Sequence, residues 1–164
     1  MREDQAVYAV SSAWDRRFMA MARLVAGWSK DPSTGCGAVI VDDKRRIVST
    51  GYNGFPAGCE DSPVILADRE HRLSRTIHSE VNAILFARRD LTGCSLYVWP
   101  MPPCVRCATL IAQSGIARVV SPPACDDLLM RWGGSIAAAR RIFGECGVEV
   151  VECGLSGGDD GDQD

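Results

Sequence analysis

Two short stretches, His78-Ser79-Glu80 and Pro103-Cys104-Val105-Arg106-Cys107, decide how this sequence of 164 residues is interpreted. Together they offer one imidazole and two thiols, side chains that bind zinc. A structural zinc site is usually closed by four Cys or His ligands, whereas a catalytic site keeps one position for water. Three ligands with a free carboxylate beside them therefore predict an open site that holds one Zn²⁺ ion per chain.

The order of these residues also predicts a reaction. H-x-E followed by P-C-x-x-C is the signature of zinc nucleobase deaminases, in which the Glu moves protons and is not a ligand. We therefore predict His78, Cys104 and Cys107 as zinc ligands and Glu80 as the catalytic residue. Zinc would lower the pKa of a bound water to roughly 7. Glu80 would carry the water proton to the ring nitrogen and assist the departure of ammonia.

Other interpretations of these cysteines remain open. A C-x-x-C pair can be a redox motif, although thioredoxin-like use has no need of the preceding His78-Ser79-Glu80. A structural zinc would need a fourth ligand, for which Cys94 and Cys125 are the candidates. A second metal site made by Cys59 and His71 would match no standard spacing.

The cysteine count bears on the compartment. The chain has eight cysteines, and its N-terminus has no apolar signal stretch. We therefore expect a cytoplasmic protein with reduced thiols. Apart from the two predicted ligands, the cysteines are expected to behave as small buried hydrophobic residues; they are Cys36, Cys59, Cys94, Cys125, Cys146 and Cys153.

The composition is that of an ordinary globular enzyme, with 46% hydrophobic and 24% charged residues. No apolar run approaches the length of a membrane span. The formal net charge of -3 argues against tight nucleic-acid binding. We expect one catalytic domain over residues 1–153. Residues 154–164, with four Asp among Gly and Ser, are expected to be a disordered acidic tail.

Hydrophobic periodicity predicts alternating helices and strands. An apolar stripe from Trp14 to Trp28 indicates a helix over residues 11–28 with Ser11 or Ser12 as its cap. A hairpin and a long Gly/Pro loop over residues 53–63 follow, and loops of this length are usually functional. The later strands are joined by helices, which implies an α/β fold with a mixed sheet. The predicted helices are 77–89, 104–114 and 127–143, the last weakened by two glycines, and the predicted strands are 36–41, 46–52, 95–99, 117–121 and 148–151.

These elements place the predicted ligands at the starts of two helices. His78 and Glu80 fall in the first turn of one helix, and Cys104 and Cys107 in the first turn of another. Residues three apart lie on the same helix face, which suits a tetrahedral centre. The positive end of each helix also stabilises a thiolate. Two helix N-termini can therefore point at one metal ion.

Four segments together resemble the deoxycytidylate (dCMP) deaminases of the cytidine deaminase superfamily. The likeness extends from about Trp14 to Cys153. It implies a three-layer α/β/α fold with a five-stranded mixed sheet, a homo-oligomer (hexamer or dimer), and conversion of dCMP to dUMP with release of ammonia. The segments are Gly35-Cys-Gly-Ala-Val-Ile-Val41, Gly51-Tyr-Asn-Gly-Phe-Pro56, His78-Ser-Glu-Val-Asn-Ala-Ile84 and Pro103-Cys-Val-Arg-Cys-Ala108.

The resemblance also implies substrate contacts. Asn53 matches a family Asn that binds the substrate sugar; alternatively it holds a left-handed turn. Lys30 and Ser33 are candidates for phosphate contact. Trp99 replaces a residue that is commonly Thr in the family, in a segment one residue longer, so base selection can differ. Trp99 would then stack on a base or pack as part of the core.

An effector site is implied as well. In the family, the segment that matches residues 51–56 and an Arg that matches Arg89 bind dCTP as an activator and dTTP as an inhibitor. The candidate effector residues are therefore Gly51, Tyr52, Gly54 and Arg89. Arg89 alone could equally be a surface charge at a helix C-terminus.

Three functions follow from the sequence. The first is a deaminase of a free deoxynucleotide, with dCMP preferred. The second is a deaminase of another nucleotide or of a base in tRNA or single-stranded DNA, which would want a cationic groove and a stacking platform. The third is a non-catalytic module stabilised by zinc, which predicts four protein ligands.

Overall fold

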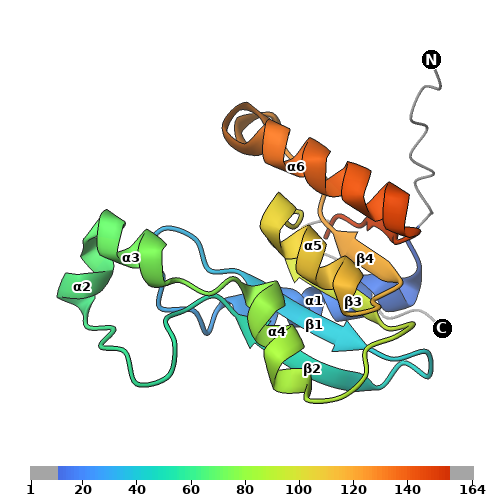
Figure 1. The fold of residues 1–164 in the computed structure, drawn as a ribbon, viewed down its shortest axis with the longest axis horizontal. Helices are drawn as coiled ribbons and strands as arrows, with labels where there is room; N and C mark the ends of the chain where they lie inside the picture. The colour runs from blue at the N-terminus through green and yellow to red at the C-terminus, as the bar shows by residue number, and fades with distance from the viewer. Residues whose placement is uncertain (1–10, 156–164) are drawn as a thin grey trace.

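A five-stranded mixed sheet forms the centre of the molecule in a computed structural model that describes residues 11–155 (Figure 1). The strand order is β2-β1-β3-β4-β5. β1 runs antiparallel to β2 and β3, whereas β3, β4 and β5 are parallel. The predicted mixed sheet is confirmed, with bounds β1 (Gly37–Val41), β2 (Ile47–Tyr52), β3 (Ser95–Trp99), β4 (Arg118–Ser121) and β5 (Glu149–Glu152).

Helices cover both faces of this sheet, because β1 is buried on both sides. Ala38 and Ile40 of β1 point into one apolar cluster, which α4 (Ser79–Ala87), α5 (Val105–Gln113) and α6 (Asp126–Cys146) complete. The alternate residues of β1 and β3 point into a second cluster against α1 (Ala13–Ala26). Successive strand residues face opposite sides, so one helix on one face and three on the other give the predicted three layers.

The start of α1 follows the sequence prediction closely. Ser12 is the N-cap, and its side chain accepts a hydrogen bond of 3.1 Å from the backbone of Asp15. The carboxylate of Asp15 accepts in turn from the backbone N–H of Ser12 at 2.7 Å. This reciprocal capping box satisfies two amides that helix geometry leaves without partners.

Two features of the chain differ from the prediction. The loop after β2 ends at two short helices that periodicity did not indicate, α2 (Pro63–Ala67) and α3 (Arg69–Arg75). α6 begins one residue earlier and ends three residues later than predicted, despite its two adjacent glycines. The helix continues through them because its buried stripe of Leu128, Ile136 and Phe143 packs on both sides of the pair.

The cysteines only partly match the expectation of burial. Cys94 and Cys153 are buried and Cys36 is half-buried, but the other three are exposed. Cys125 and Cys146 lie at the two ends of α6, and Cys59 lies in the loop before α2, where little chain covers them. The predicted acidic tail lies outside the described residues, except for Gly154 and Leu155.

Candidate active site

The three predicted zinc ligands meet at one point. His78 is the N-cap of α4 and Cys104 is the N-cap of α5, with Cys107 one turn further along α5. The Nδ1 atom of His78 lies 3.6 Å from Sγ of Cys104 and 3.3 Å from Sγ of Cys107. All three ligand atoms lie within 4.8 Å of one another. The predicted convergence of two helix N-termini is confirmed.

This donor set fits zinc. One imidazole and two thiols suit zinc better than magnesium or calcium, which prefer oxygen ligands. Within residues 11–155, these three residues form the single group of His, Cys and acidic side chains close enough to share an ion. Cys94 lies in the apolar core and Cys125 at the exposed start of α6, so neither completes a closed site. Cys59 and His71 likewise form no second group.

A graded burial gives the site one open side. His78 is exposed, Cys104 is half-buried and Cys107 is buried. Three side-chain donors leave a position on a tetrahedral ion, and the exposed side is where a small molecule can reach it. The geometry is that of an open site.

The contact between the two thiols shifts their pKa values in opposite directions. The hydrogen bond with Cys107 lowers the pKa of the Cys104 thiol to about 3, although burial opposes this shift. The same hydrogen bond, together with burial, raises the pKa of Cys107. The hydrogen bond with Cys104 also raises the pKa of His78. Because zinc binds thiolates and a neutral imidazole, its binding releases these protons.

Glu80 lies beside the ligands in a dry environment. Its residue is 5% exposed, and one carboxylate oxygen accepts a hydrogen bond of 3.0 Å from the Ser79 hydroxyl. Burial raises the pKa of Glu80 above its ordinary value, against the opposing effect of hydrogen bonds. A raised pKa brings a carboxyl group closer to the range in which it can both take up and release a proton. Glu80 therefore has the environment of a proton-transfer residue.

Comparison with known proteins gives the family. The sequence profile of the "Cytidine and deoxycytidylate deaminase zinc-binding region" matches residues 12–122, which contain all three ligands and Glu80. The chain belongs to this deaminase family. A zinc ion is therefore its cofactor, and His78, Cys104 and Cys107 are the residues that could hold it.

Individual relatives of this deaminase agree with that placement. An uncharacterized deaminase in the luxG 3' region of Aliivibrio fischeri is 49% identical over 140 residues, 85% of this chain and 93% of the relative. A deoxycytidylate deaminase of Mus musculus is 44% identical over 115 residues, 65% of this chain and 63% of the relative. The match thus spans less than two thirds of the mouse protein.

A solved structure confirms the fold. The dCMP deaminase from the cyanophage S-TIM5 in complex with dCMP and dUMP has a TM-score of 0.67 with 22% identity. The alignment covers 88% of this chain and 100% of the cyanophage chain. The cytidine deaminase-like α/β/α fold of this family is therefore established for the chain.

Asn53, the predicted sugar contact of the deaminase, anchors a neighbouring loop. Its side-chain oxygen accepts a hydrogen bond of 2.7 Å from the backbone of Cys36, and its amide donates to the carbonyl of Thr34 at 2.9 Å. It does not have a positive φ, so the alternative of a left-handed turn is wrong. The side-chain oxygen and the side-chain nitrogen of Asn53 each retain one further hydrogen-bonding position. Contact with a sugar therefore stays a prediction.

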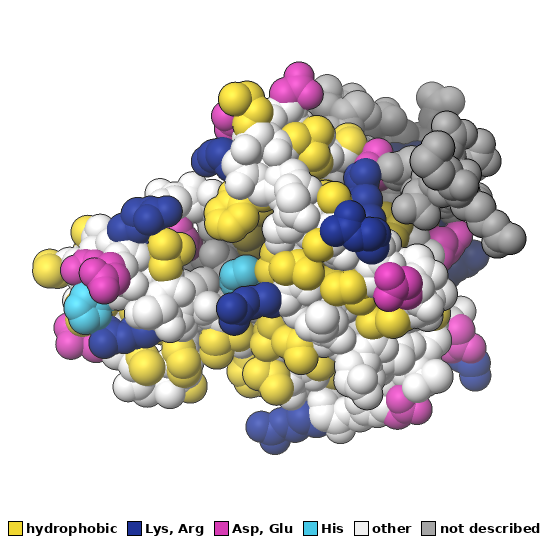
Figure 2. Space-filling model, turned by 45° about the horizontal axis from the view of Figure 1, so that its top comes forward, with side chains coloured by type: hydrophobic (Ala, Val, Ile, Leu, Met, Phe, Trp, Pro, Cys, Tyr) yellow, Lys and Arg dark blue, Asp and Glu magenta, His cyan; other side chains and the backbone are white. Residues whose placement is uncertain are grey.

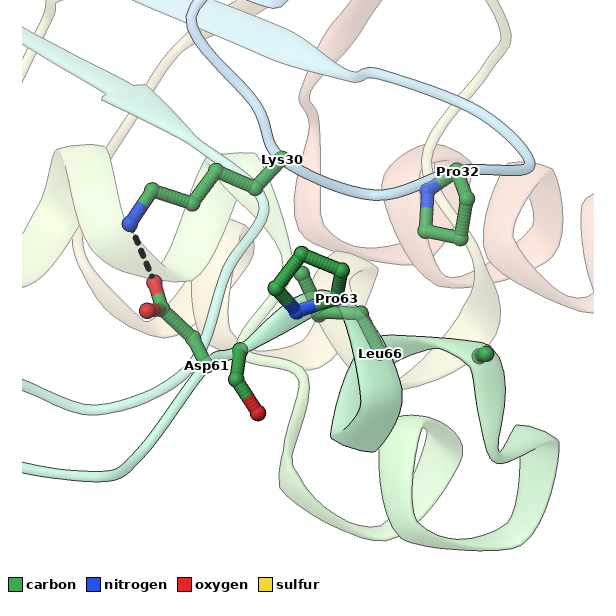
Figure 3. A pocket seen from close by; sticks show the side chains of 7 residues that line it. Lys30, Pro32, Asp61, Pro63 and Leu66 are labelled. Atoms are coloured by element: carbon green, nitrogen blue, oxygen red, sulfur yellow. Dashed lines mark hydrogen bonds and ion pairs between the residues drawn. The ribbon is translucent and has the colours of Figure 1, made fainter.

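The two candidate phosphate contacts lie on the segment before β1. Lys30 is exposed and forms an ion pair of 2.8 Å with Asp61. The pair stands at the edge of a cavity of about 460 Å³ between this segment and α2 (Figure 3). The hydroxyl of Ser33 accepts a hydrogen bond of 3.0 Å from Arg72. Phosphate contact by either residue stays a prediction.

Trp99 ends β3 and packs against the cluster under α1. Its ring is half-buried and lies 5.7 Å from the guanidinium of Arg23. These contacts support the interpretation that Trp99 packs as part of the core. Stacking of Trp99 on a base stays a prediction.

The candidate effector residues lie at the end of β2 and after α4. Gly51 packs against α4, and the Tyr52 ring is 43% exposed. Gly54 pairs with Ile77 through backbone hydrogen bonds of 3.1 and 2.8 Å, next to the ligand His78. Arg89 lies just after the C-terminal end of α4 and is exposed, which agrees with the alternative that it is a surface charge at a helix C-terminus. An effector role for these residues stays a prediction.

The sequence interpretation missed two residues beside Glu80. Ser79 is fully buried and donates to the catalytic carboxylate. Cys36 is half-buried, and burial, followed by the charge of Glu80, raises the pKa of its thiol to about 12. Ser79 is the variable position of the H-x-E motif, so the motif could have indicated it. No sequence pattern connects Cys36 with Glu80, which is 44 positions further along the chain.

Proposed function

We propose that this protein converts dCMP to dUMP and ammonia by zinc-dependent hydrolysis. The observation that carries the proposal is the meeting of His78, Cys104 and Cys107 within 4.8 Å, beside the buried carboxylate of Glu80. The choice of dCMP rests on the segment Gly51-Tyr-Asn-Gly-Phe-Pro56 and on the 44% identity to the mouse deoxycytidylate deaminase.

Proton transfer falls to Glu80 in this proposal. When bound, zinc supplies a Lewis acid that makes hydroxide available at neutral pH. Glu80 takes a proton from the attacking water and delivers it to the ring nitrogen of the base. It then assists protonation of the amine, which leaves as ammonia while the water oxygen stays on the ring. The hydroxyl of Ser79 holds one oxygen of Glu80 and so fixes the direction of the carboxylate.

The sugar and phosphate of the nucleotide are proposed to bind on the opposite wall of the site. Lys30 and Ser33 are the proposed phosphate contacts, because their segment reaches Cys36, near Glu80. Asn53 is the proposed sugar contact, because it binds this segment at Cys36. Trp99 closes the end of β3 and is the proposed influence on base selection.

Regulation and assembly complete the proposal. We propose dCTP and dTTP as effectors at Gly51, Tyr52, Gly54 and Arg89, and a homo-oligomer in the cytoplasm. Within residues 11–155, no helix combines the length and apolarity needed to cross a membrane.

A nucleic-acid substrate has less support. The net charge is -3, and on the face drawn in Figure 2 the described Lys and Arg side chains are dispersed among acidic and apolar ones. A polynucleotide deaminase would want these cations gathered into a groove.

Ammonia release tests these alternatives directly. The zinc-loaded protein is incubated with dCMP, dCTP, CMP, dAMP, tRNA and single-stranded oligonucleotides, with and without added dCTP or dTTP. We expect the highest kcat/KM for dCMP, and a response to the two triphosphates. Turnover of oligonucleotides without turnover of any free nucleotide would favour the second function, and no turnover of any substrate would favour a non-catalytic zinc module.

A further inference from the structure

Arg72 of α3 is a buried cation six positions before the candidate zinc ligand His78. Among residues 11–155 it is the one Lys or Arg residue in the buried class, at 9% exposure. Its guanidinium donates to the carbonyl of Leu66 at 2.6 Å and to the hydroxyl of Ser33 at 3.0 Å. A third nitrogen lies 3.7 Å from the carboxylate of Asp31. A buried guanidinium with three partners holds a definite geometry.

The surroundings of Arg72 make these contacts decisive. α2 and α3, here called the flap (Pro63–Arg75), project from one end of the sheet (Figure 1). Within the described part of the chain, these helices pack on each other and on no other helix or strand. A cavity of about 460 Å³ separates α2 from Lys30 and Pro32 (Figure 3). Because no other helix or strand of the described residues packs on the flap, the contacts of Arg72 with Ser33 and Asp31 directly link the flap to the segment before β1.

The partners of Arg72 lead toward the catalytic carboxylate. Asp31 accepts hydrogen bonds from the backbone of Ser33 at 2.8 Å and of Thr34 at 3.2 Å. The Thr34 carbonyl accepts from the side chain of Asn53, whose oxygen accepts from the backbone of Cys36. The link between Arg72 and Asp31 is an ion pair of 3.7 Å, and the links from Asp31 to Cys36 are hydrogen bonds. The segment 31–36 is thus held at one end by the flap and at the other by Asn53.

We propose that Arg72 is a positioning residue that fixes the segment 31–36 as the nucleotide-binding wall of the active site. This proposal rests on the proposed function, because Ser33 and Asn53 are there the phosphate and sugar contacts. Arg72 is buried and its guanidinium contacts Leu66, Ser33 and Asp31, so in this proposal it acts through Ser33 and Asp31 and not by touching the substrate. Its loss should weaken binding of the nucleotide and leave proton transfer by Glu80 intact.

The test compares kcat and KM for dCMP in zinc-loaded wild type, Arg72→Gln, Arg72→Lys and Ser33→Ala. We expect Arg72→Gln to raise KM about tenfold, the usual effect of losing hydrogen bonds to a charged group, with kcat and zinc content retained. A rise in KM at constant kcat marks lost ground-state binding. Arg72→Lys keeps the positive charge but not the planar guanidinium, so its KM should lie between those of wild type and Arg72→Gln.

A double variant distinguishes positioning from a general structural role. If Arg72 acts through Ser33, Arg72→Gln combined with Ser33→Ala should raise KM no further than the larger single effect. Arg69→Gln, an exposed Arg on the same helix, is the matched control and should match wild type. Unchanged KM in Arg72→Gln, additive effects in the double variant, or loss of zinc and kcat with a lowered melting temperature would overturn the proposal.

Failure of the proposed function gives a different result. If wild type does not deaminate dCMP but deaminates another nucleotide, the assigned substrate is wrong. The kcat and KM of the Arg72 variants are then compared with that nucleotide as substrate. If wild type deaminates dCMP and the Arg72 variants behave like wild type, the proposed function stands and the role of Arg72 is refuted.

Discussion

Gly51 of β2 lies against Ala83 of α4 with no room for a side chain. A methyl group on Gly51 would come within 2.4 Å of the backbone nitrogen of Ala83 and of the carbonyl oxygen of Ser79. Both are backbone atoms, so neither can rotate away. This contact therefore fixes the distance between α4 and the sheet. It also fixes the positions of His78 and Glu80 at the start of that helix.

Substitution of Gly51 by Ala should displace α4 and damage the site. Overpacking of this kind costs about 1 to 3 kcal/mol of unfolding free energy. Misplacement of a catalytic group by about 1 Å can cost about 100-fold in rate, so kcat and zinc affinity should both fall. Steady-state assays, zinc analysis and thermal unfolding measure these effects. Gly134→Ala is the control, since an added methyl there meets no atom within 4 Å; normal zinc content and kcat in Gly51→Ala would contradict the close contact.

Replacing Glu80 by Gln should separate metal binding from catalysis. The amide has the shape of the carboxylate but cannot carry a proton, so kcat should fall by about 10²- to 10⁴-fold. Zinc should remain at one ion per chain, because Glu80 is outside the group of three ligands. Glu70→Gln changes an exposed Glu of α3 and should have no effect. Retained turnover in zinc-loaded Glu80→Gln would exclude Glu80 as the proton carrier.

Removal of zinc should abolish activity and lower thermal stability. The ion binds side chains from two helices, so its binding free energy adds to that of folding. We expect a chelator to abolish ammonia release and lower the melting temperature, and one equivalent of Zn²⁺ per chain to restore both. Cys107→Ser should reproduce the loss in the presence of zinc. Restoration that needs two equivalents per chain would contradict a single site.

Local patterns in the sequence predicted the features that depend on neighbouring residues. The stripe from Trp14 to Trp28 predicted α1, which ends at Ala26, and alternation or apolar runs predicted the strands. The zinc ligands could be predicted because two local motifs carry them, His78-Ser79-Glu80 and Cys104 with Cys107. Each motif lies within one helical turn, where spacing defines geometry. Their meeting across 26 and 29 positions followed from two helix starts and the demands of one ion.

Contacts between distant residues had no such pattern. Arg72 and Ser33 are separated by 39 positions, and Arg118 and Asp15 by 103. The flap was missed because its helices have five and seven residues, too short for a periodicity to emerge. Exposure of Cys125 and Cys146 depends on what covers the ends of α6, which residue type alone does not specify.

A buried ion pair on the far face of the sheet predicts the acid sensitivity of the fold. Asp15 is 1% exposed and accepts hydrogen bonds from Arg118 at 2.7 and 3.0 Å and from the Tyr97 hydroxyl at 2.9 Å. Burial alone would raise the pKa of Asp15, but the bonds from Arg118, Ser12 and Tyr97 outweigh it and hold the pKa well below 3.8. The carboxylate thereby joins the start of α1 to β3 and β4.

The sign of the pH effect follows from this lowered pKa. An unfolded Asp titrates near about 3.9, so the stabilisation is complete above that pH and is lost as pH falls toward the folded pKa. Asp15→Asn should cost about 3 kcal/mol at pH 7, because it removes the buried anionic partner of Arg118 and leaves the exposed Glu149 to pair with its charge. Urea unfolding at pH 7, 5, 4 and 3 should show a steeper loss for wild type than for Asp15→Asn, a comparison in which the protonation of the zinc ligands is common to both proteins. Asp61→Asn, which removes the partner of exposed Lys30, should change the stability little. Equal slopes for wild type and Asp15→Asn would show that the pKa of this carboxyl is the same in the folded and unfolded protein, and the hydrogen bonds from Arg118 would then lose their assigned role.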